Sequence, residues 1–500
     1  MAQGEDSMWE DKQAKKDVKK ASAFLREVAG GRITVESAFE YREDGGIRIA
    51  LPQVPAKMGL KKAANMLLAQ AEAEEAMHEF TKPFDCRPMD GAVAFNKALK
   101  DVFGMTAIGK EIRSFFGGQL PELRTVKISP TEEIQVPFGL LKFPPYGAEF
   151  YLQERPDEDY GMAFQIYVMA KKKYEVEIRG LLMLVESYIR QDSIYRNKAL
   201  IGVGRIAGGA YKEPEFFNPY TIDREKVVYA QTVGDALTYS IWGRIQKSEL
   251  LRKVKPSLLG NKVLMHGENG TGKTLAAAIT AQFCLEHDWS FIQARYDEDL
   301  KHVMRFAELL GTPVAVVIED VEKLLSDNPR KMDELMEQFD GMRTKGREVM
   351  LLMTSNYPEK LPPELTRAGR INRMIYVSDL DREGVEKLIN VMIPAGQRED
   401  LDYERLHTAY EGFAPSWIVQ ALEGVEVYTL IRTGEEGQPM STDDFVRCAD
   451  ELRSAWQMHT DAKARKKDEP EIDVALTKLV GKAIQQSAYV NDEGEIVVAA

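Results

Sequence analysis

One short stretch combines glycines, a lysine and a hydroxyl at a spacing suited to binding phosphate. Residues 266–274 read His-Gly-Glu-Asn-Gly-Thr-Gly-Lys-Thr, which fits the pattern GxxxxGK[ST], and an apolar run precedes them while a helical pattern follows. Glycines let backbone N–H groups turn toward phosphate oxygens, and the N-terminus of the following helix favours an anion. We expect Lys273 to contact the β- and γ-phosphates of a nucleotide and the Thr274 hydroxyl to bind Mg²⁺. The predicted phosphate loop comprises Gly267, Glu268, Asn269, Gly270, Thr271, Gly272, Lys273 and Thr274.

Two adjacent acids, Glu319 and Asp320, follow the apolar run Val-Ala-Val-Val-Ile at 314–318. At the tip of such a strand in a phosphate-loop ATPase, one acid holds Mg²⁺ and its neighbour polarises the attacking water. By position, Glu319 is the metal-binding acid and Asp320 is the catalytic base. Aspartate is one methylene shorter than the usual glutamate, so the water must lie closer or be oriented differently, and slow turnover is one expected outcome. The plainer interpretation is a pair of acids that merely caps a strand.

A third apolar run, 349–353, leads into Thr-Ser-Asn, and the amide of Asn356 could hold the attacking water. Three arginines follow, at positions 367, 370 and 373. This stretch is similar to the second region of homology of AAA ATPases in the narrow sense, whose consensus reads roughly T-N-x-P-x-x-L-x-P-A-L-x-R-P-G-R-x-D-R. The resemblance covers about 220–460.

The resemblance implies roles for these residues and an assembly. Asn356 matches the sensor asparagine, Arg370 and Arg373 match the arginine fingers that act on a neighbouring subunit's nucleotide, and Arg367 matches a structural arginine. The family also implies ATP and Mg²⁺ as cofactors and a homo-oligomeric, hexameric ring. An ordinary alternative for Arg370 is an ion pair with a nearby acid such as Glu364.

The sequence also departs from the family. Residues 295–313 contain no aromatic-Val-Gly tripeptide of the kind that grips a translocated polypeptide; Tyr296 is the aromatic near the loop, and Phe306 fits a helix core. The short connection and the Glu-Asp order resemble the mitochondrial Rieske-protein translocase branch, and the layout is similar to uncharacterised AAA proteins of bacteria and their phages. Residues 412–417 read Gly-Phe-Ala-Pro-Ser-Trp where the family shows Gly-Phe-Ser-Gly-Ala-Asp, so the family's adenine contact is not transferred.

The helices and strands expected around these residues indicate an α/β P-loop AAA+ core, in which helices flank a parallel sheet. We also expect an α-helical lid and an N-terminal α+β accessory domain. Apolar runs with both faces covered are typical of parallel strands, and we expect such strands at 262–265, 290–294, 314–318 and 349–353. The expected divisions are a helical segment at 1–81, an accessory or substrate domain at 82–215, the nucleotide-binding domain at 216–380, the lid at 381–465, and a C-terminal helix and tail at 466–500.

Periodicity makes further local predictions. We expect helices at 8–29, 60–80, 176–191 and 472–486, a pair of strands at 148–155 and 162–169, and either a strand or a frayed tail at 496–498. Lys171–Lys173 reads as a solvated turn rather than a phosphate site.

Composition limits the functional classes. The 500-residue chain carries 66 Lys and Arg against 79 Asp and Glu, a net charge of −13, which disfavours general binding of nucleic acid or anionic membrane. Three widely spaced cysteines without a CxxC pair suit a reducing cytoplasm, and the sequence contains no apolar run long enough to span a membrane.

We expect an ATP-driven ring that remodels, unfolds or translocates a protein client. The alternatives are a nucleic-acid motor or loader, and a slow nucleotide-dependent assembly switch.

Overall fold

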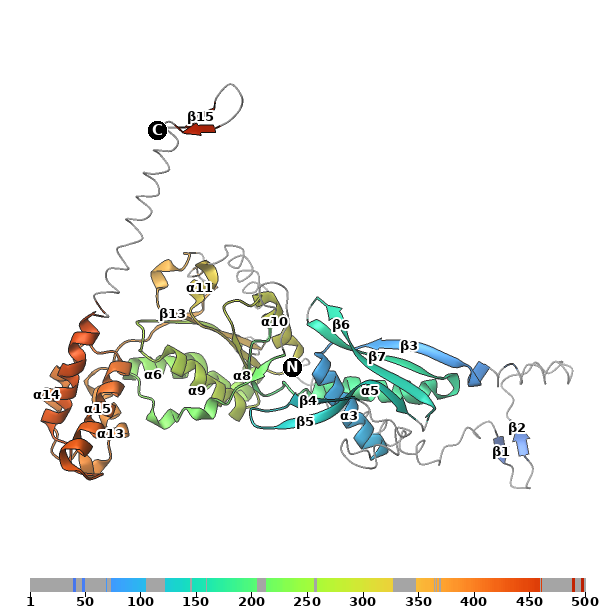
Figure 1. Cartoon of the computed structure of the whole chain (residues 1–500), viewed down its shortest axis with the longest axis horizontal. Coiled ribbons are helices and arrows are strands. Elements are labelled where there is room, and N and C mark those ends of the chain that lie inside the picture. Colours follow the sequence, from blue (N-terminus) through green and yellow to red (C-terminus); the bar gives the residue numbers. More distant parts are fainter. Residues whose placement is uncertain are drawn as a thin grey trace. The chain divides into compact units, whose positions relative to one another are not determined.

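The structure is a computed structural model (Figure 1). The residues it describes are 73–104, 122–143, 146–158, 160–204, 213–255, 259–326, 348–363 and 370–458, the single positions 69, 365, 367 and 460, and the short strands 39–41, 47–49, 488–490 and 496–498. The predicted helices at 8–29 and 472–486 lie outside these residues.

The larger compact unit contains a seven-stranded sheet of order β14-β10-β13-β12-β11-β8-β9. All neighbouring strands are parallel except β8 and β9. The four predicted parallel strands are confirmed, and β12 and β13 are buried along their whole length. The bounds are β8 Ala199–Ile201, β9 Glu215–Phe216, β10 Lys262–His266, β11 Ser290–Ala294, β12 Val314–Ile318, β13 Val349–Ser355 and β14 Arg373–Tyr376.

Helices pack along this sheet, and its carboxyl edge carries the predicted phosphate loop. Helix α9 (Lys273–Glu286) follows β10 directly and contacts β11, β12 and β13. Helix α10 (Leu300–Leu309) begins with an Asp299 cap, whose carboxylate accepts the Lys301 N–H. The remaining helices of this region are α6 Gln231–Leu237, the π-helical turn Thr238–Trp242, α7 Gly243–Gln246, α8 Ser248–Val254 and α11 Val321–Ser326.

The same unit contains a five-stranded antiparallel sheet of order β3-β7-β6-β5-β4, with helices α3 and α5 along one side of it (Figure 1). We call this sheet and its two helices the accessory domain. Its bounds are β3 Met77–Pro83, α3 Pro88–Phe103, β4 Glu122–Lys127, β5 Glu133–Phe143, β6 Ala148–Asp157, β7 Gly161–Lys171 and α5 Glu175–Asp192.

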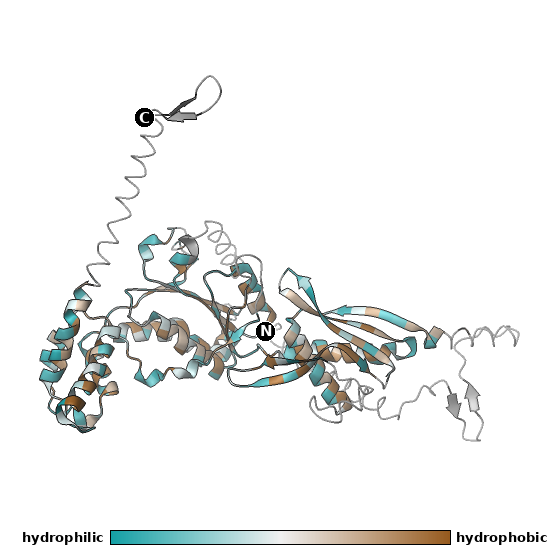
Figure 2. Ribbon diagram, viewed as in Figure 1, coloured by the Kyte–Doolittle hydropathy of each residue, from teal (hydrophilic) through white to brown (hydrophobic). Residues whose placement is uncertain are grey.

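The predicted hairpin and the helix at 176–191 are confirmed, because β6 pairs with β7 around the expected turn and α5 follows. Hydropathy alternates along these strands, with one face buried against the helices (Figure 2). A single hydrophobic core runs from the accessory domain into the seven-stranded sheet and includes Phe95, Phe164, Leu200 and Ile292.

Two sequence-based expectations are wrong in this part. The segment 1–81 is not purely helical, because it contains the hairpin β1 Phe39–Tyr41 with β2 Ile47–Ile49 and most of β3. Residues 77–80, expected in a helix, pair with β7 instead, since strand pairing outweighs local helix propensity here. Strand β8 precedes the expected boundary at 215/216 and β9 crosses it, yet both belong to the seven-stranded sheet.

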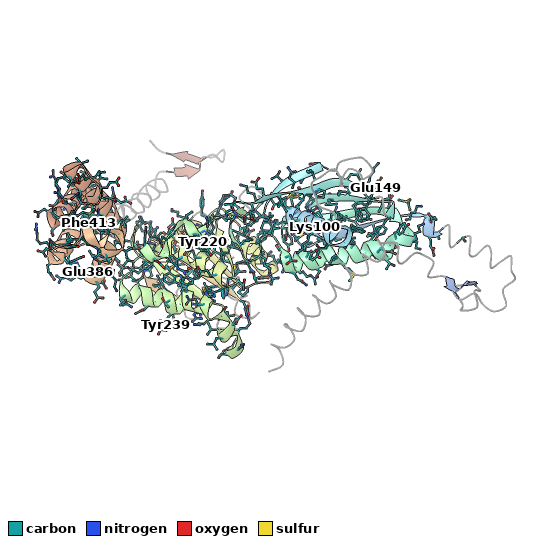
Figure 3. All side chains as sticks on the ribbon, turned by 90° about the horizontal axis from the view of Figure 1, so that it is seen from below. Lys100, Glu149, Tyr220, Tyr239, Glu386 and Phe413 are labelled. Carbon is teal, nitrogen blue, oxygen red and sulfur yellow. The ribbon has the colours of Figure 1, made fainter. Side chains whose placement is uncertain are left out.

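The smaller compact unit consists of residues 224–234, 268–272 and 377–500. Its helical part contains α13 Arg382–Met392, α14 Tyr403–Tyr410, α15 Pro415–Thr433 and a last helix at 442–458. Asp381 and Asp402 cap the first two of these helices, and Gly434 ends α15 in the left-handed conformation. Phe413 lies within this lid, whose core also includes the fully buried Phe445 (Figure 3).

Two further features complete the description. The tail residues Ile496–Val498 form strand β16, which pairs with β15 (Ala488–Val490), so the strand alternative is confirmed. No helix in the described part of the chain combines the length and hydropathy that a bilayer span needs.

Candidate functional site

Lys273 is held close to its own loop. Its side chain is only 7% exposed, and its ammonium group donates to the Gly267 carbonyl at 3.0 Å. Burial, with a smaller effect from the nearby Lys273 charge, lowers the pKa of His266. A buried ammonium group can bind an anion through charge-assisted hydrogen bonds, which is the role expected for this lysine.

The tip of the phosphate loop packs within the smaller unit. The Tyr229 hydroxyl donates to the Gly272 carbonyl at 2.8 Å, and the Ser416 N–H donates to the Gly270 carbonyl at 3.1 Å. Gly270 and Gly272 have φ values of 84° and 100°, and a Cβ at Gly270 would lie 2.1 Å from the Ser416 Oγ. Both positions therefore require glycine, for the backbone conformation and for the close approach of the lid.

Glu319 has the environment of a metal-binding acid. The Gln293 amide donates to its Oε2 at 3.1 Å, and the Thr274 hydroxyl also bonds to this carboxylate. Its Oε1 is buried without a hydrogen-bond partner. Burial, and secondarily the charge of Asp320, raise the pKa of Glu319.

These oxygen donors fit Mg²⁺, which prefers oxygen ligands and usually retains several waters. The buried Oε1 of Glu319 lacks a partner that a cation or its water would supply, and the Thr274 hydroxyl lies beside it. Within the described residues, no cluster of three or more His, Cys, Asp or Glu side chains could hold a metal. Thr274 and Glu319 are the groups of this site that could hold Mg²⁺.

Asp320 is fixed by three neighbours. Its N–H donates to the Thr354 hydroxyl at 3.0 Å, its Oδ1 accepts from the Asn356 amide at 2.7 Å, and its Oδ2 accepts from the Lys323 ammonium at 2.6 Å. Its φ of 48° is left-handed, a conformation that only a few residue types adopt readily. Such a constrained carboxylate at a strand tip is suited to hold a water in one orientation.

Asn356 lies in the expected place but with an additional contact. Its side chain touches Asp320, and its N–H donates to Glu322 Oε1 at 2.9 Å. The structure thus brings together the acidic strand end and Asn356, which the sequence predicted separately.

Sequence reasoning missed the contacts of Gln293, Thr354, Glu322 and Lys323. Gln293 left a signal, because it is a polar residue inside an otherwise apolar strand. Thr354 also stands at the end of an apolar run, whereas Glu322 lies in α11 and left no such signal. Lys323 left none, because its ion pair depends on how α11 leaves β12.

The arginines lie apart from this cluster. Arg373 begins β14 and is in register with Val263, whereas the phosphate loop follows the other end of β10. Arg370 lies in the preceding turn, where its N–H donates to the Arg367 carbonyl at 3.1 Å. Burial and the charge of Arg373 lower the pKa of Arg244, so two cations gather at this edge strand. The position of Glu364 lies outside the described residues.

The connection after β11 differs from a gripping loop. Tyr296 is 59% exposed, while Phe306 is buried in α10 as predicted. The loop is anchored at Glu298, whose carboxylate accepts from the N–H groups of Gly204 and Arg295 at 2.9 Å each.

Comparison with known proteins agrees with this geometry. Residues 263–379 match the family model described as "ATPase family associated with various cellular activities (AAA)". This part of the chain is therefore similar to AAA domains, and the fold is an α/β P-loop AAA+ core with a helical lid.

Three relatives illustrate the range of the match. The chain is 24% identical over 247 residues to "ATP-dependent zinc metalloprotease FtsH 2" of Bdellovibrio bacteriovorus, covering 45% of this chain and 39% of that protein. It is 27% identical over 173 residues to "Cell division cycle protein 48 homolog" of Archaeoglobus fulgidus, covering 30% and 23%. It is 28% identical over 149 residues to "ATPase histone chaperone abo1" of Schizosaccharomyces pombe, covering 26% and 12%. The chain therefore spans at most 39% of these relatives' lengths.

Proposed function

We propose that this protein hydrolyses ATP and uses the reaction to change the conformation of a protein client. The convergence of Thr274, Glu319, Asp320 and Asn356 at the carboxyl edge of the parallel sheet carries this proposal. The similarity to AAA ATPases supports it.

The residues divide the reaction between them. Lys273 would bind the β- and γ-phosphates, while Thr274 and Glu319 would hold Mg²⁺. Bound Mg²⁺ supplies neutralisation of the charge that develops on the phosphate oxygens. Asp320 orients and polarises the attacking water, and the amide of Asn356 fixes Asp320 in position.

A ring assembly follows from the arginines. Arg373 is in register with Val263, three residues before the end of β10 that leads into the phosphate loop, so a role at the nucleotide of a neighbouring subunit is favoured over one at its own. We propose a homo-oligomeric, hexameric ring in which Arg370 and Arg373 act on the next subunit's ATP. The cations gathered at the edge strand β14 favour an anionic partner there.

A protein client is favoured over nucleic acid. Lys171 and Lys173, the basic run in the accessory domain, both pair with Glu75 and lower the pKa of Glu75 to about 2. This run is therefore partly neutralised rather than free to track a phosphate backbone.

The short connection after β11 and the Glu-Asp order support placing the chain near the Rieske-protein translocase branch. Both carboxylate oxygens of Asp320 already accept hydrogen bonds from protein groups, which supports the alternative of a slow nucleotide-dependent switch. The three cysteines, all buried and unpaired, support a cytoplasmic location.

The test is the ATPase rate of the purified protein alone, with a reduced unfolded protein, with single-stranded DNA and with RNA. We expect Mg²⁺-dependent turnover that the unfolded protein stimulates, and loss of ATP affinity by titration calorimetry in Lys273→Ala, because charge-assisted contacts are worth about 1.5–3 kcal/mol. Stimulation by DNA or RNA alone would support the nucleic-acid alternative. Unchanged ATP affinity in Lys273→Ala would contradict the phosphate-loop assignment.

A further inference from the structure

A groove of about 420 Å³ lies where two sheets end beside each other. Strand β4 is the terminal strand of the accessory sheet, and β9 is a terminal strand of the seven-stranded sheet. Thr125 and Lys127 of β4 and Phe216 of β9 all line the groove. Among the described strands, β4 pairs with β5 alone, so its outer backbone groups can accept another strand.

The walls of the groove combine an apolar base with a carboxylate. Met89 of α3 and the ring of Phe216, which stacks on Tyr195 at 5.9 Å between centroids, supply apolar surface. Glu213 faces the groove, and its carboxylate accepts the Tyr195 hydroxyl. Glu213 is exposed and lines the groove, so its carboxylate can pair with a basic side chain placed beside it. Lys127, the basic group of the lining, already lies 3.8 Å from Glu133.

We propose that this groove binds an extended peptide segment of the client, which adds as a strand along β4 and places a basic side chain beside Glu213. The inference deepens the proposed function and rests on it for the identity of the ligand as a client. Strand β4 spans Glu122–Lys127, so the segment it can pair has about six residues. Alternate side chains of such a strand would enter the apolar base, while the backbone supplies hydrogen bonds that do not depend on sequence.

The groove is also connected to the metal-binding acid. Glu215, another lining residue, pairs with Arg295 at 2.8 Å. The Arg295 guanidinium packs closely over Gly202, where a Cβ would lie 3.1 Å from its Cζ. Two residues before Arg295, Gln293 donates to Glu319. A peptide that displaces Glu215 or tightens its pair with Arg295 therefore acts on the strand that orients Glu319.

The binding test uses fluorescein-labelled ten-residue peptides on the full chain, measured by anisotropy. One peptide alternates valine and lysine, a second alternates valine and glutamate, and a third is the lysine peptide with two central prolines. The three native cysteines are buried, so Thr125→Cys can be modified with a bulky maleimide to fill the groove. Thr81→Cys on β3, the opposite edge of the same sheet, is the matched control.

We expect the lysine peptide to bind, and the glutamate and proline peptides to bind about tenfold more weakly or not at all. Modified Thr125→Cys should lose about tenfold in affinity, modified Thr81→Cys should not, and Glu213→Gln should weaken only the lysine peptide. Equal binding to modified and unmodified Thr125→Cys overturns the inference. The inference is also overturned if the Thr125 label blocks the binding of a fluorescent oligonucleotide. A change in oligomer size on labelling would overturn it as well, because the groove would then be an interface between copies of the chain.

The coupling has its own readout. The lysine peptide should raise the ATPase rate about fivefold, and Arg295→Gln should keep peptide affinity while losing this stimulation. Peptide binding at the groove in a protein that hydrolyses no ATP would refute the proposed function and leave the groove in place. ATP turnover without peptide binding at the groove would refute this inference and leave the proposed function standing.

Discussion

Replacing Asp320 by asparagine should stop hydrolysis while leaving ATP bound. The substitution keeps the shape of the side chain, and asparagine adopts left-handed conformations more readily than most residues, so the φ of 48° is not a source of misfolding. What changes is the chemistry, because an amide cannot take a proton from water. Its NH₂ group would also face either the Asn356 amide or the Lys323 ammonium, both of which are donors.

The expected size follows from these contacts. A positioned general base contributes about 10²–10⁴ in rate, or about 3–5 kcal/mol of transition-state stabilisation. The donors on both Asp320 oxygens belong to the protein, and neither contacts the phosphate loop in the described hydrogen bonds. We therefore expect kcat to fall by about 10²–10⁴ with little change in ATP affinity.

The assay pairs single-turnover ATP hydrolysis with calorimetric ATP binding. Asp288→Asn is the matched control, because Asp288 is also an aspartate with a left-handed φ, 59°, and lies beyond the far end of α9. It should hydrolyse ATP at the wild-type rate. If Asp320→Asn turns over within threefold of wild type while Glu319→Gln binds ATP and stalls, the two acids have the opposite roles and the positional assignment is wrong.

Three further predictions concern the site, the assembly and the accessory domain. Lys323→Met should raise kcat by up to about fivefold, because an exposed ion pair worth about 0.2–1 kcal/mol would no longer occupy Asp320 Oδ2. A fall in kcat would instead show that Lys323 positions Asp320. Arg370→Ala mixed with Lys273→Ala should regain ATPase activity that neither has alone, since an intact loop can meet an intact arginine; absence of recovery in mixed oligomers confirmed by mass photometry would exclude action between subunits. Burial raises the pKa of Asp90 to about 6 from an ordinary 3.8, so the folded state binds more protons than the unfolded state between these pH values. The contribution of Asp90 to the free energy of unfolding therefore falls as pH rises through this window. Asp90→Asn should therefore gain up to about 3 kcal/mol relative to wild type between pH 4 and pH 7 in urea unfolding, whereas the exposed Asp192→Asn should show no comparable gain.

The sequence predicted the parts of the fold that leave long local patterns. The buried strand at 314–318 is predicted because both faces of a central parallel strand are covered, which produces an unbroken apolar run, and the strand at 290–294 shows a similar run that Gln293 interrupts. Strands β8, β9 and β14 have two to four residues, too few for a periodicity to emerge. Their existence depends on neighbours in space, as does that of β3, whose Ala- and Glu-rich approach favours a helix locally.

The site shows the same division. The phosphate loop is one contiguous motif, and Glu319 and Asp320 follow one strand, so both could be predicted from local sequence. The contact of Gln293 with Glu319 requires β11 to lie beside β12, and that of Asn356 with Asp320 requires β13 on the other side. These side-chain contacts therefore depend on the order of the strands in the sheet, and the spacing of residues along the chain does not reveal that order.

The shared core leads to a last prediction, about where the chain can be divided. Strand β8 lies before residue 216 but hydrogen-bonds along β11, and the accessory residue Arg87 lies 5.7 Å from the ring of Phe306 in α10. A protein beginning at 216 would expose the edge of β11 and uncover Phe291 and Ile292, which are 1% and 0% exposed. Burying one such side chain is worth about 1.5–3 kcal/mol, so losing cover over several approaches the whole stability of a domain.

We therefore expect residues 216–500 alone to aggregate or to unfold without a cooperative transition. A protein beginning at 73, which retains every described element of both sheets in the larger unit, should unfold cooperatively. Size-exclusion chromatography and thermal unfolding followed by circular dichroism distinguish the two. A monodisperse 216–500 protein with the melting temperature of the longer one would show that the accessory domain is a separable attachment. The opposite result would mean that the accessory domain completes the fold of the seven-stranded sheet, so that whatever binds to it also bears directly on β11.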